Sequence, residues 1–379
     1  MQKPATANGE KMGSAIWFME GLSCQQDILS AVRKARVTAG ADFQIIASHR
    51  QPRLEILAEA DFSYLEPAED EARLAFIRHV ATKHAVRAIH TGKNGAWFEE
   101  HRQSIEKMGI RLTTGALNRE TFDLADDKYA FSQLMKRHGL PVVDAQRFTT
   151  ADELSHLLEA HYAQPGTLDV LPCIKPVQGI YGMGFWTLDK NASLMACFQQ
   201  SDRRRVHPDT YLLALKQAES AGAISPPMLF MPWLPGPERS VDMVVEKGKV
   251  RTAVSRCKTS DGQRLEQRGE AYELAIACAQ VMKADGLINV QTRHFTDGKP
   301  YLLETNLRPS GGVGYTLHSG INLPGIFALR QLGLVNESSI LAAEAFRERT
   351  VKPTHAVQPV PQSLATLLSY SVPTLSQVD

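Results

Sequence analysis

The first 118 residues alternate short apolar runs with longer amphipathic stretches. Runs of four to six mainly apolar residues predict buried strands, and apolar residues at three- and four-residue spacing predict helices. The predicted strands lie at 15–19, 43–47, 60–64, 86–90 and 110–113, and the predicted helices at 25–39, 69–84 and 97–108. Regular alternation of this kind is typical of a parallel sheet covered by helices on both faces. The pattern therefore predicts a small doubly wound α/β domain.

Beyond residue 118 the pattern becomes less regular. A polar-capped helix is predicted over 123–138, where Gly139 and Pro141 end it, and a further helix over 151–163. Strands and helices then mix in an α+β manner to about residue 347. The predicted boundaries are 1–118, 119–235, 236–348 and 349–379. The last segment is rich in Pro, Ser and Thr, and we expect it to be poorly ordered or draped over the surface.

Composition narrows the class of protein. The 379 residues include 42 Lys and Arg against 41 Asp and Glu, which gives a net charge of +1. A chain with so little excess positive charge and no basic block is not expected to bind nucleic acids. The cluster Arg203-Arg204-Arg205 is expected on a solvated face. No apolar run is long enough to span a bilayer, and the five scattered cysteines form no CxxC pair. We expect a cytoplasmic enzyme with reduced thiols and no contact with a membrane.

Two segments carry lysines in positions suited to phosphate binding. Lys128 follows Asp127 at the start of a helix, although a lone helical lysine is more often a surface residue. Lys175 ends an apolar strand and is followed by a loop that contains Gly179, Gly182 and Gly184. Glycines allow backbone amides to approach phosphate oxygens, and lysine adds a positive charge. An ordinary glycine-rich hairpin with an edge lysine is the alternative.

A third segment, 230–242, joins two apolar strands through a linker rich in Pro and Gly. Its backbone and apolar side chains could form a wall for a flat purine, and Glu238 could accept hydrogen bonds from ribose hydroxyls. A proline-rich hairpin connection is the plainer alternative.

The fourth segment is the most specific. Period-two alternation places Glu304 and Asn306 on one face of a strand, and Arg308 continues that row. A turn at 297–298 folds the preceding strand back, so Gln291 can lie beside Glu304. One carboxylate and two carboxamide oxygens make a site suited to magnesium, the alternative being the polar face of a hairpin. The backbone amides of Ser310, Gly311 and Gly312 could hold a substrate carboxylate or an oxyanion.

In this order, the four segments resemble the ATP-grasp superfamily, and 289–291 with Glu304 and Asn306 most resembles its carbamoyl phosphate synthetase branch. The resemblance covers about residues 15–345 and implies an ATP-grasp fold preceded by a small pre-grasp domain, with a glycine-loop lid within 119–235 and the metal site within 236–348. It implies ATP and Mg²⁺ (or Mn²⁺) as cofactors. The chain departs from the family at Met231, where an acidic residue is usual, and at Gln291, where many members have a carboxylate.

The resemblance also implies a role for each matching position. ATP would contact Lys128, Lys175, Gly182, Gly184, Met231, Trp233, Leu234 and Glu238, the metal would contact Gln291, Glu304 and Asn306, and the substrate would contact Ser310, Gly311 and Gly312. Arg308 and Lys175 would act in catalysis.

Through the resemblance, these matching residues imply a carboxylate–amine (or carboxylate–thiol) ligase that forms an acyl-phosphate and acts on small-molecule substrates. A homodimer would also fit the family. A non-catalytic ATP-binding regulatory module and a small-molecule kinase are the rival functions.

Overall fold

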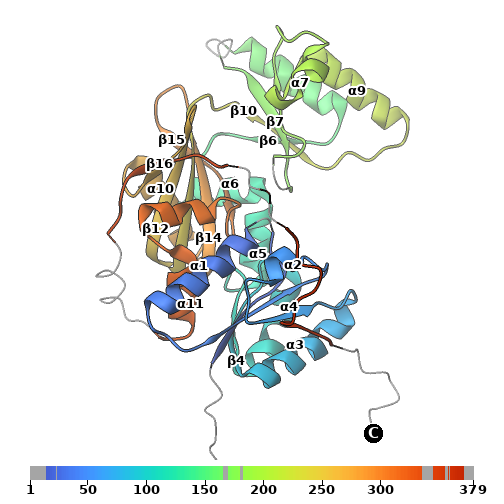
Figure 1. The fold of residues 1–379 in the computed structure, drawn as a ribbon. Coiled ribbons are helices and arrows are strands. Elements are labelled where there is room, and N and C mark those ends of the chain that lie inside the picture. Colours follow the sequence, from blue (N-terminus) through green and yellow to red (C-terminus); the bar gives the residue numbers. More distant parts are fainter. Residues whose placement is uncertain are drawn as a thin grey trace, which may run out of the picture.

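The computed structural model describes residues 14–22, 24–164, 170–179, 182–334, 345–354, 357 and 359–370. Within these residues the chain forms three sheets (Figure 1). Two of them lie together in the lower and middle parts of the view, and the third stands apart at the top. The predicted combination of α/β and α+β parts is confirmed.

The first sheet is parallel and has the strand order β17-β3-β2-β1-β4-β5. Its strands are β1 (Ala15–Phe18), β2 (Gln44–His49), β3 (Phe62–Leu65), β4 (Val86–His90), β5 (Arg111–Thr113) and β17 (Leu367–Leu368). Its connections contain α1 (Gln25–Thr38), the short α2 (Leu54–Leu57), α3 (Asp70–His84) and α4 (Gly95–Glu106). The prediction missed α2, whose four residues are too few to show a helical period, and the edge strand β17, which comes from the C-terminal tail.

Alternate residues of β1 enter two separate cores. Ile16 and Phe18 pack with α1 on one face, whereas Trp17 packs with α3 and α4 on the other. Because both faces of the sheet are covered by helices, its strands are apolar along their whole length. The predicted doubly wound domain is confirmed.

The second sheet has the order β6-β10-β7-β8-β9 and lies at the top of Figure 1. Its strands are β6 (Gln146–Phe148), β7 (Pro172–Pro176), β8 (Trp186–Leu188), β9 (Arg205–Val206) and β10 (Met228–Pro232). The helical segments of this part are α7 (Ala151–Ala163), α8 (Ala196–Gln199), η1 (Ser201–Arg203) and α9 (Pro208–Ser220). Residues of α7 and α9 pack on the sheet in a small core of their own.

The third sheet has the order β15-β14-β11-β12-β13-β16 and is antiparallel throughout. Its strands are β11 (Glu238–Glu246), β12 (Lys249–Thr259), β13 (Gly262–Glu266), β14 (Gly286–His294), β15 (Pro300–Asn306) and β16 (Arg349–Val351). One face packs on α5 (Arg119–Asp126), α6 (Lys128–Arg137) and α10 (Glu270–Val281). The other packs on α11 (Leu323–Gln331), which follows η2 (Val313–Ser319), and joins the core that contains α1.

The single helix predicted over 123–138 is two helices. Asp127 leaves the helical conformation, with φ −88° and ψ 98°, and its carboxylate accepts hydrogen bonds from the amides of Tyr129 and Ala130 at 2.9 and 2.8 Å. An aspartate at this position satisfies amides that the first turn leaves unpaired. The break makes Lys128 the first residue of α6.

The C-terminal tail extends two sheets. Residues 349–351 pair with β13, and residues 367–368 pair in parallel with β3. Leu364 and Leu367 pack on the core that contains α1, and the Tyr370 ring lies against the Phe76 ring in a tilted arrangement, with the centroids 5.0 Å apart. Where the structure describes the tail, it is therefore draped over the surface, which is one of the two predicted alternatives.

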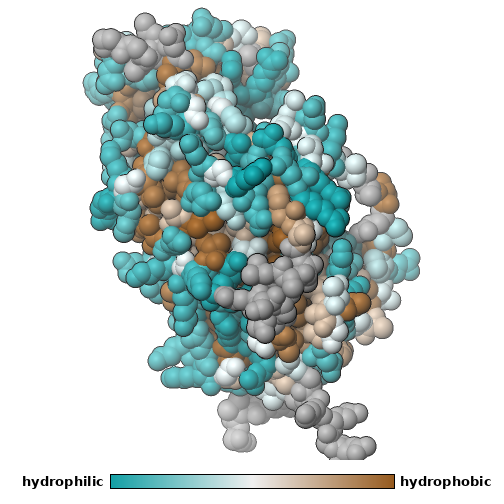
Figure 2. All heavy atoms as spheres, turned by 90° about the vertical axis from the view of Figure 1, so that its left-hand side faces the viewer, coloured by the Kyte–Doolittle hydropathy of each residue, from teal (hydrophilic) through white to brown (hydrophobic). Residues whose placement is uncertain are grey.

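The described helices are all too short or too polar to cross a membrane. On the face shown in Figure 2, hydrophilic residues predominate, and hydrophobic residues show between them mainly over the middle of the molecule.

His90, at the end of β4, should make the protein less stable in acid. Its ring is buried between Phe18 and Phe327 with neither nitrogen hydrogen-bonded, and burial lowers its pKa from 6.5 to about 4. The imidazole of His90 therefore binds a proton below about pH 6.5 in the unfolded chain, but only below about pH 4 in the folded protein. The free energy of unfolding consequently decreases as the pH falls from about 6.5 to about 4. The shift corresponds to about 3 kcal/mol.

The measurement is urea unfolding at several pH values for the wild type and His90→Phe. Glu66, whose pKa burial raises from 4.5 to about 6, contributes a slope of opposite sign, so the difference between the two proteins isolates His90. Equal slopes in both proteins would contradict the assignment.

Candidate functional site

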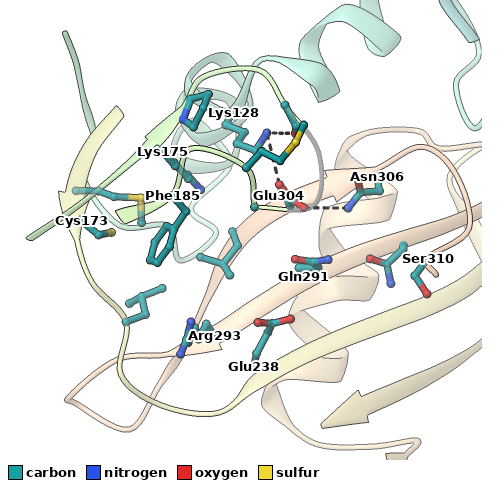
Figure 3. Close-up of a pocket in the computed structure, with 18 of the residues that line it drawn as sticks. Lys128, Cys173, Lys175, Phe185, Glu238, Gln291, Arg293, Glu304, Asn306 and Ser310 are labelled. Atoms are coloured by element: carbon teal, nitrogen blue, oxygen red, sulfur yellow. Dashed lines mark hydrogen bonds and ion pairs between the residues drawn. The ribbon is translucent and has the colours of Figure 1, made fainter. Parts of the chain in front are cut away.

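A cavity of about 480 Å³ lies between the second and third sheets. Of the site residues predicted from the sequence, the cavity wall contains Lys128, Lys175, Gly182, Met231, Trp233, Leu234, Glu238, Gln291, Glu304, Asn306, Arg308, Ser310 and Gly311. Gly184 and Gly312 are not part of the wall. Figure 3 shows the lysines and the Glu304 carboxylate facing the same space. Segments separated by more than 100 residues thus contribute to one site.

Two lysines meet at the end of the cavity nearest Glu304. The Lys128 Nζ donates to the Gly179 carbonyl at 2.9 Å and lies 3.6 Å from the Glu304 Oε2. Lys175 projects from β7, which pairs with β10. Burial lowers the pKa of Lys175, while the Glu304 carboxylate opposes that shift. Positive charge concentrated in a partly desolvated wall is suited to an anionic ligand such as a phosphate chain.

The glycine loop needs its glycines. Gly182 and Gly184 have φ of +62° and +73°, which residues with a Cβ rarely adopt. A Cβ on Gly184 would also lie 2.7 Å from the Pro176 side chain. Gly184 therefore shapes the turn, whereas Gly182 contacts the cavity. Ile180 and Tyr181 of the predicted loop lie outside the described residues.

The cluster 203–205 was expected on a solvated face. Arg203 and Arg205 are exposed, as expected, whereas Arg204 is half-buried. Its side chain lines the cavity and donates to the Gly182 carbonyl. The neighbouring Arg205 lies over the Trp233 ring, with the guanidinium carbon 5.8 Å from the ring centroid, and Arg293 lies 5.7 Å from the same centroid. Sequence clustering alone cannot separate a solvated arginine from one turned into a cavity.

The end of β10 and the residues that follow it form another wall of the cavity. Met231 and Leu234 are buried, and the Trp233 amide donates to the Leu171 carbonyl at 2.8 Å. Glu238 begins β11 and forms an ion pair with Lys258 at 2.6 Å. Lys258 was not predicted as a site residue, because it lies on β12, outside the four segments.

The three predicted metal-binding residues, Gln291, Glu304 and Asn306, lie on two paired strands, and we call them the oxygen cluster. In the pairing of β14 with β15, Gln291 lies opposite Glu304 and Asn289 opposite Asn306, so the predicted hairpin is confirmed. A register shift follows directly after Gln291. The Asn306 Nδ2 donates to the Glu304 Oε1 at 3.2 Å, as the dashed line in Figure 3 marks.

This donor set fits a hard cation. Carboxylate and amide oxygens are ligands that Mg²⁺ prefers, and Mg²⁺ is commonly bound through one or two carboxylates together with substrate phosphates. Among the described residues, no three His, Cys, Asp or Glu side chains gather into a cage, so a cation here would depend on the amides and on a phosphate-bearing ligand.

Behind the cluster lies a buried polar network that the sequence did not predict. The Arg256 Nε donates to the Asp242 Oδ2 at 2.9 Å, and its Nη2 donates to the Ser240 and Ser310 hydroxyls at 3.0 and 2.7 Å. The Ser310 amide faces the Asp242 Oδ1 at 3.4 Å. A Cβ on Gly312 would lie 2.5 Å from the Arg256 Nη1. The role of Gly312 in the structure is therefore to leave room for this arginine.

Replacing Arg256 by methionine should lower the free energy of unfolding by about 3–5 kcal/mol, because Asp242 would remain buried without its partner. The double variant Arg256→Met with Asp242→Leu should recover part of this loss, since it removes both charges. Denaturant unfolding measures the free energy of unfolding of the single and the double variant against the wild type. A loss below about 1 kcal/mol in the single variant would mean that the pair contributes little.

Comparison with known proteins gives a family match over part of the chain. Residues 224–354 match a family described as ATP-grasp in the biosynthetic pathway with Ter operon. This segment contains β11, β14 and β15 with the oxygen cluster. No curated protein sequence matches the chain significantly.

Solved structures match over most of the chain. A biotin carboxylase from Campylobacter jejuni, described as a β-γ-ATP complex, has a TM-score of 0.59 at 18% identity; the match covers 86% of this chain and 72% of that one. An ADP complex of N5-carboxyaminoimidazole ribonucleotide synthetase has a TM-score of 0.57 at 17% identity, covering 84% and 76%. An L-amino acid ligase from Bacillus licheniformis has a TM-score of 0.57 at 15% identity, covering 92% and 82%. The chain thus has the ATP-grasp fold, and the resemblance to the ATP-grasp superfamily is confirmed.

Proposed function

We propose that this protein is an ATP-dependent ligase. It activates a small carboxylate as an acyl-phosphate, which an amine or similar nucleophile then attacks, with release of ADP and phosphate. The observation that carries the proposal is the convergence of Lys128, Lys175, Glu304 and Arg308 on one cavity. The solved relatives described as carboxylases, synthetases and ligases support it.

Phosphoryl transfer requires charge and positioning more than a nucleophile–base pair. In the proposed arrangement, Lys128 and Lys175 bind the phosphate chain of ATP, with Gly182 beside it. Met231, Trp233 and Leu234 contact the adenine, and Glu238 contacts the ribose. The ion pair between Glu238 and Lys258 leaves the carboxylate with further acceptor sites for hydroxyl groups.

Gln291, Glu304 and Asn306 would hold Mg²⁺. When bound, the ion supplies positive charge that offsets the charge of the transferring phosphoryl group. Mn²⁺ prefers similar oxygen ligands and could replace it. The neutral Gln291 leaves this cluster with one carboxylate, Glu304.

The reaction proceeds in two steps. A carboxylate oxygen of the substrate attacks the γ-phosphorus of ATP, the bond to the bridging oxygen breaks, and ADP leaves. The amine nitrogen then attacks the acyl carbon, loses a proton, and inorganic phosphate leaves with the electron pair of the broken C–O bond. Arg308 stabilises the negative charge of both transition states, and Ser310 and Gly311 contact the substrate at the cavity wall.

The test combines the protein with MgATP and pools of amino acids and small carboxylic acids, and measures ADP and free phosphate separately. The proposal expects both products in equal amounts, and hydroxamate formation when hydroxylamine is added as the nucleophile. ADP with a stable phosphorylated product would instead indicate a kinase. ATP binding without ADP release across wide pools would indicate a regulatory module. That the protein forms a homodimer stays a prediction. Light scattering can measure its oligomeric state in solution.

A further inference from the structure

A second cavity, of about 220 Å³, adjoins the first one. The two share Lys128, Glu304 and Arg308 in their walls, so the second cavity opens where the proposed phosphoryl transfer takes place. Its other walls come from the loop after β4, from α5 and from the end of β15. We call it the acceptor cavity. It lies between the first and third sheets, so Leu22 and residues 92–95 of the first domain contribute to its wall.

The acceptor cavity is less than half the size of the first one, at about 220 Å³ against about 480 Å³. Its size suits a ligand smaller than the nucleotide proposed for the first cavity.

Part of the wall of the acceptor cavity is apolar. The apolar residues of its wall are Leu22, Phe122, Ala125 and Leu307, from three different parts of the chain. Ala125 and Leu307 are buried, and Leu22 and Phe122 are half-buried. Apolar walls of this kind exclude water and favour a ligand with a hydrocarbon body.

Two polar groups in the wall have no partner of their own. The Thr305 hydroxyl is buried and makes no hydrogen bond within the described residues, although a buried hydroxyl normally has one. Asp126 is exposed at the edge and forms no hydrogen bond or ion pair with any residue that the structure describes. By contrast, Lys93 in the same wall already lies 3.2 Å from the Glu20 carboxylate.

We propose that the acceptor cavity binds a small apolar α-amino acid as the carboxylate substrate of the proposed ligase. Its carboxylate lies toward Arg308 and Lys128, where phosphoryl transfer occurs. Its ammonium group donates to the Asp126 carboxylate and the Thr305 hydroxyl, and its side chain packs on Phe122 and Leu22. This inference rests on the proposed function, because that function places a carboxylate at the junction of the two cavities.

The experiment measures binding, so turnover is not needed. The full-length protein is saturated with Mg²⁺ and the non-hydrolysable analogue AMP-PNP, and is titrated calorimetrically with L-valine, L-leucine and L-methionine. The comparison ligands are 4-methylpentanoate, which lacks the amino group of leucine, and 3-methylbutylamine, which lacks its carboxylate. At least one amino acid should bind about tenfold more tightly than either comparison ligand.

Two pairs of variants test the residues. Asp126→Asn should weaken amino-acid binding about tenfold and leave 4-methylpentanoate unaffected, whereas Glu120→Gln removes a charge from the same helix outside the cavity and should change neither. Thr305→Val keeps the side-chain shape and should weaken amino-acid binding several-fold. Thr292→Val is its control, because the Thr292 hydroxyl is also buried and unpartnered but lines neither cavity.

Several outcomes would overturn the inference. They are equal binding of 4-methylpentanoate and the amino acids, unchanged affinity in Asp126→Asn and Thr305→Val, and binding of AMP-PNP with no binding of any amino acid tested. Each of these leaves the proposed function standing. Failure of AMP-PNP itself to bind would overturn the proposed function instead.

Discussion

Replacing Lys175 by alanine should lower ATP turnover by about a thousandfold, because the transferring phosphoryl group loses a charge placed beside it in a partly desolvated wall. ATP affinity should also fall, since the phosphates lose a charge-assisted hydrogen bond. The measurements are ADP release under saturating substrate pools and ATP binding by calorimetry. Lys107→Ala, an exposed lysine outside both cavities, is the control and should change neither.

The lowered pKa of Lys175 gives this prediction a second readout. In the free protein, burial favours the neutral amine, whereas bound phosphates favour the charged form and raise the pKa again. ATP binding should therefore take up a proton, and affinity should decline as pH rises from the pKa of the free protein toward that of the complex. Calorimetry in buffers of different ionisation enthalpy measures this uptake. Equal uptake in the wild type and Lys175→Ala would show that another group binds the proton.

Replacing Glu304 by glutamine should lower turnover by about a hundredfold to a thousandfold, because the oxygen cluster then has no charged ligand for a cation. The change keeps the side-chain volume. It also removes the carboxylate that lies 3.6 Å from the Lys128 Nζ, so this lysine becomes more available to phosphates. ATP binding without Mg²⁺ should consequently be unchanged or tighter, while the gain in affinity on adding Mg²⁺ should shrink.

Glu238→Gln is the matched comparison for this variant, because it also neutralises a carboxylate in the cavity wall but lies outside the oxygen cluster. It should weaken nucleotide binding with and without Mg²⁺ to the same extent. An unchanged Mg²⁺ dependence in Glu304→Gln would mean that this carboxylate is not a metal ligand.

Features fixed by neighbouring residues were predicted well from the sequence. The strand over 86–90 and the helix over 151–163 have the predicted bounds, because apolar runs, helical spacing and caps are local signals. Gln291 was placed opposite Glu304 because a short turn joins their strands. The helix break at Asp127 was missed, since aspartate is tolerated within an amphipathic pattern and only its capping hydrogen bonds reveal the break.

Features that depend on distant residues were not predicted. The contact between Arg256 and Ser310 spans 54 positions, and nothing near either residue indicates it. Arg204 enters the cavity because the second sheet places it beside the glycine loop. Phe122 and Asp126 become cavity residues only when α5 packs beside the loop after β4. The chemical motifs could thus be predicted from the sequence. The residues that surround each motif could not, because they depend on how the three sheets pack together.

The pairing of β17 with β3 has a consequence for the synthesis of the chain. Leu367 lies opposite Ser63, about 300 positions away, so the first sheet lacks one edge strand until residues 367–368 have been translated. At roughly 5–20 residues per second, the ribosome needs tens of seconds to make the intervening chain. During this time the β3 edge exposes unpaired backbone groups, which can pair with other chains. Chaperone dependence and aggregation during expression should therefore rise when the tail is shortened, even though the proposed active site lies elsewhere.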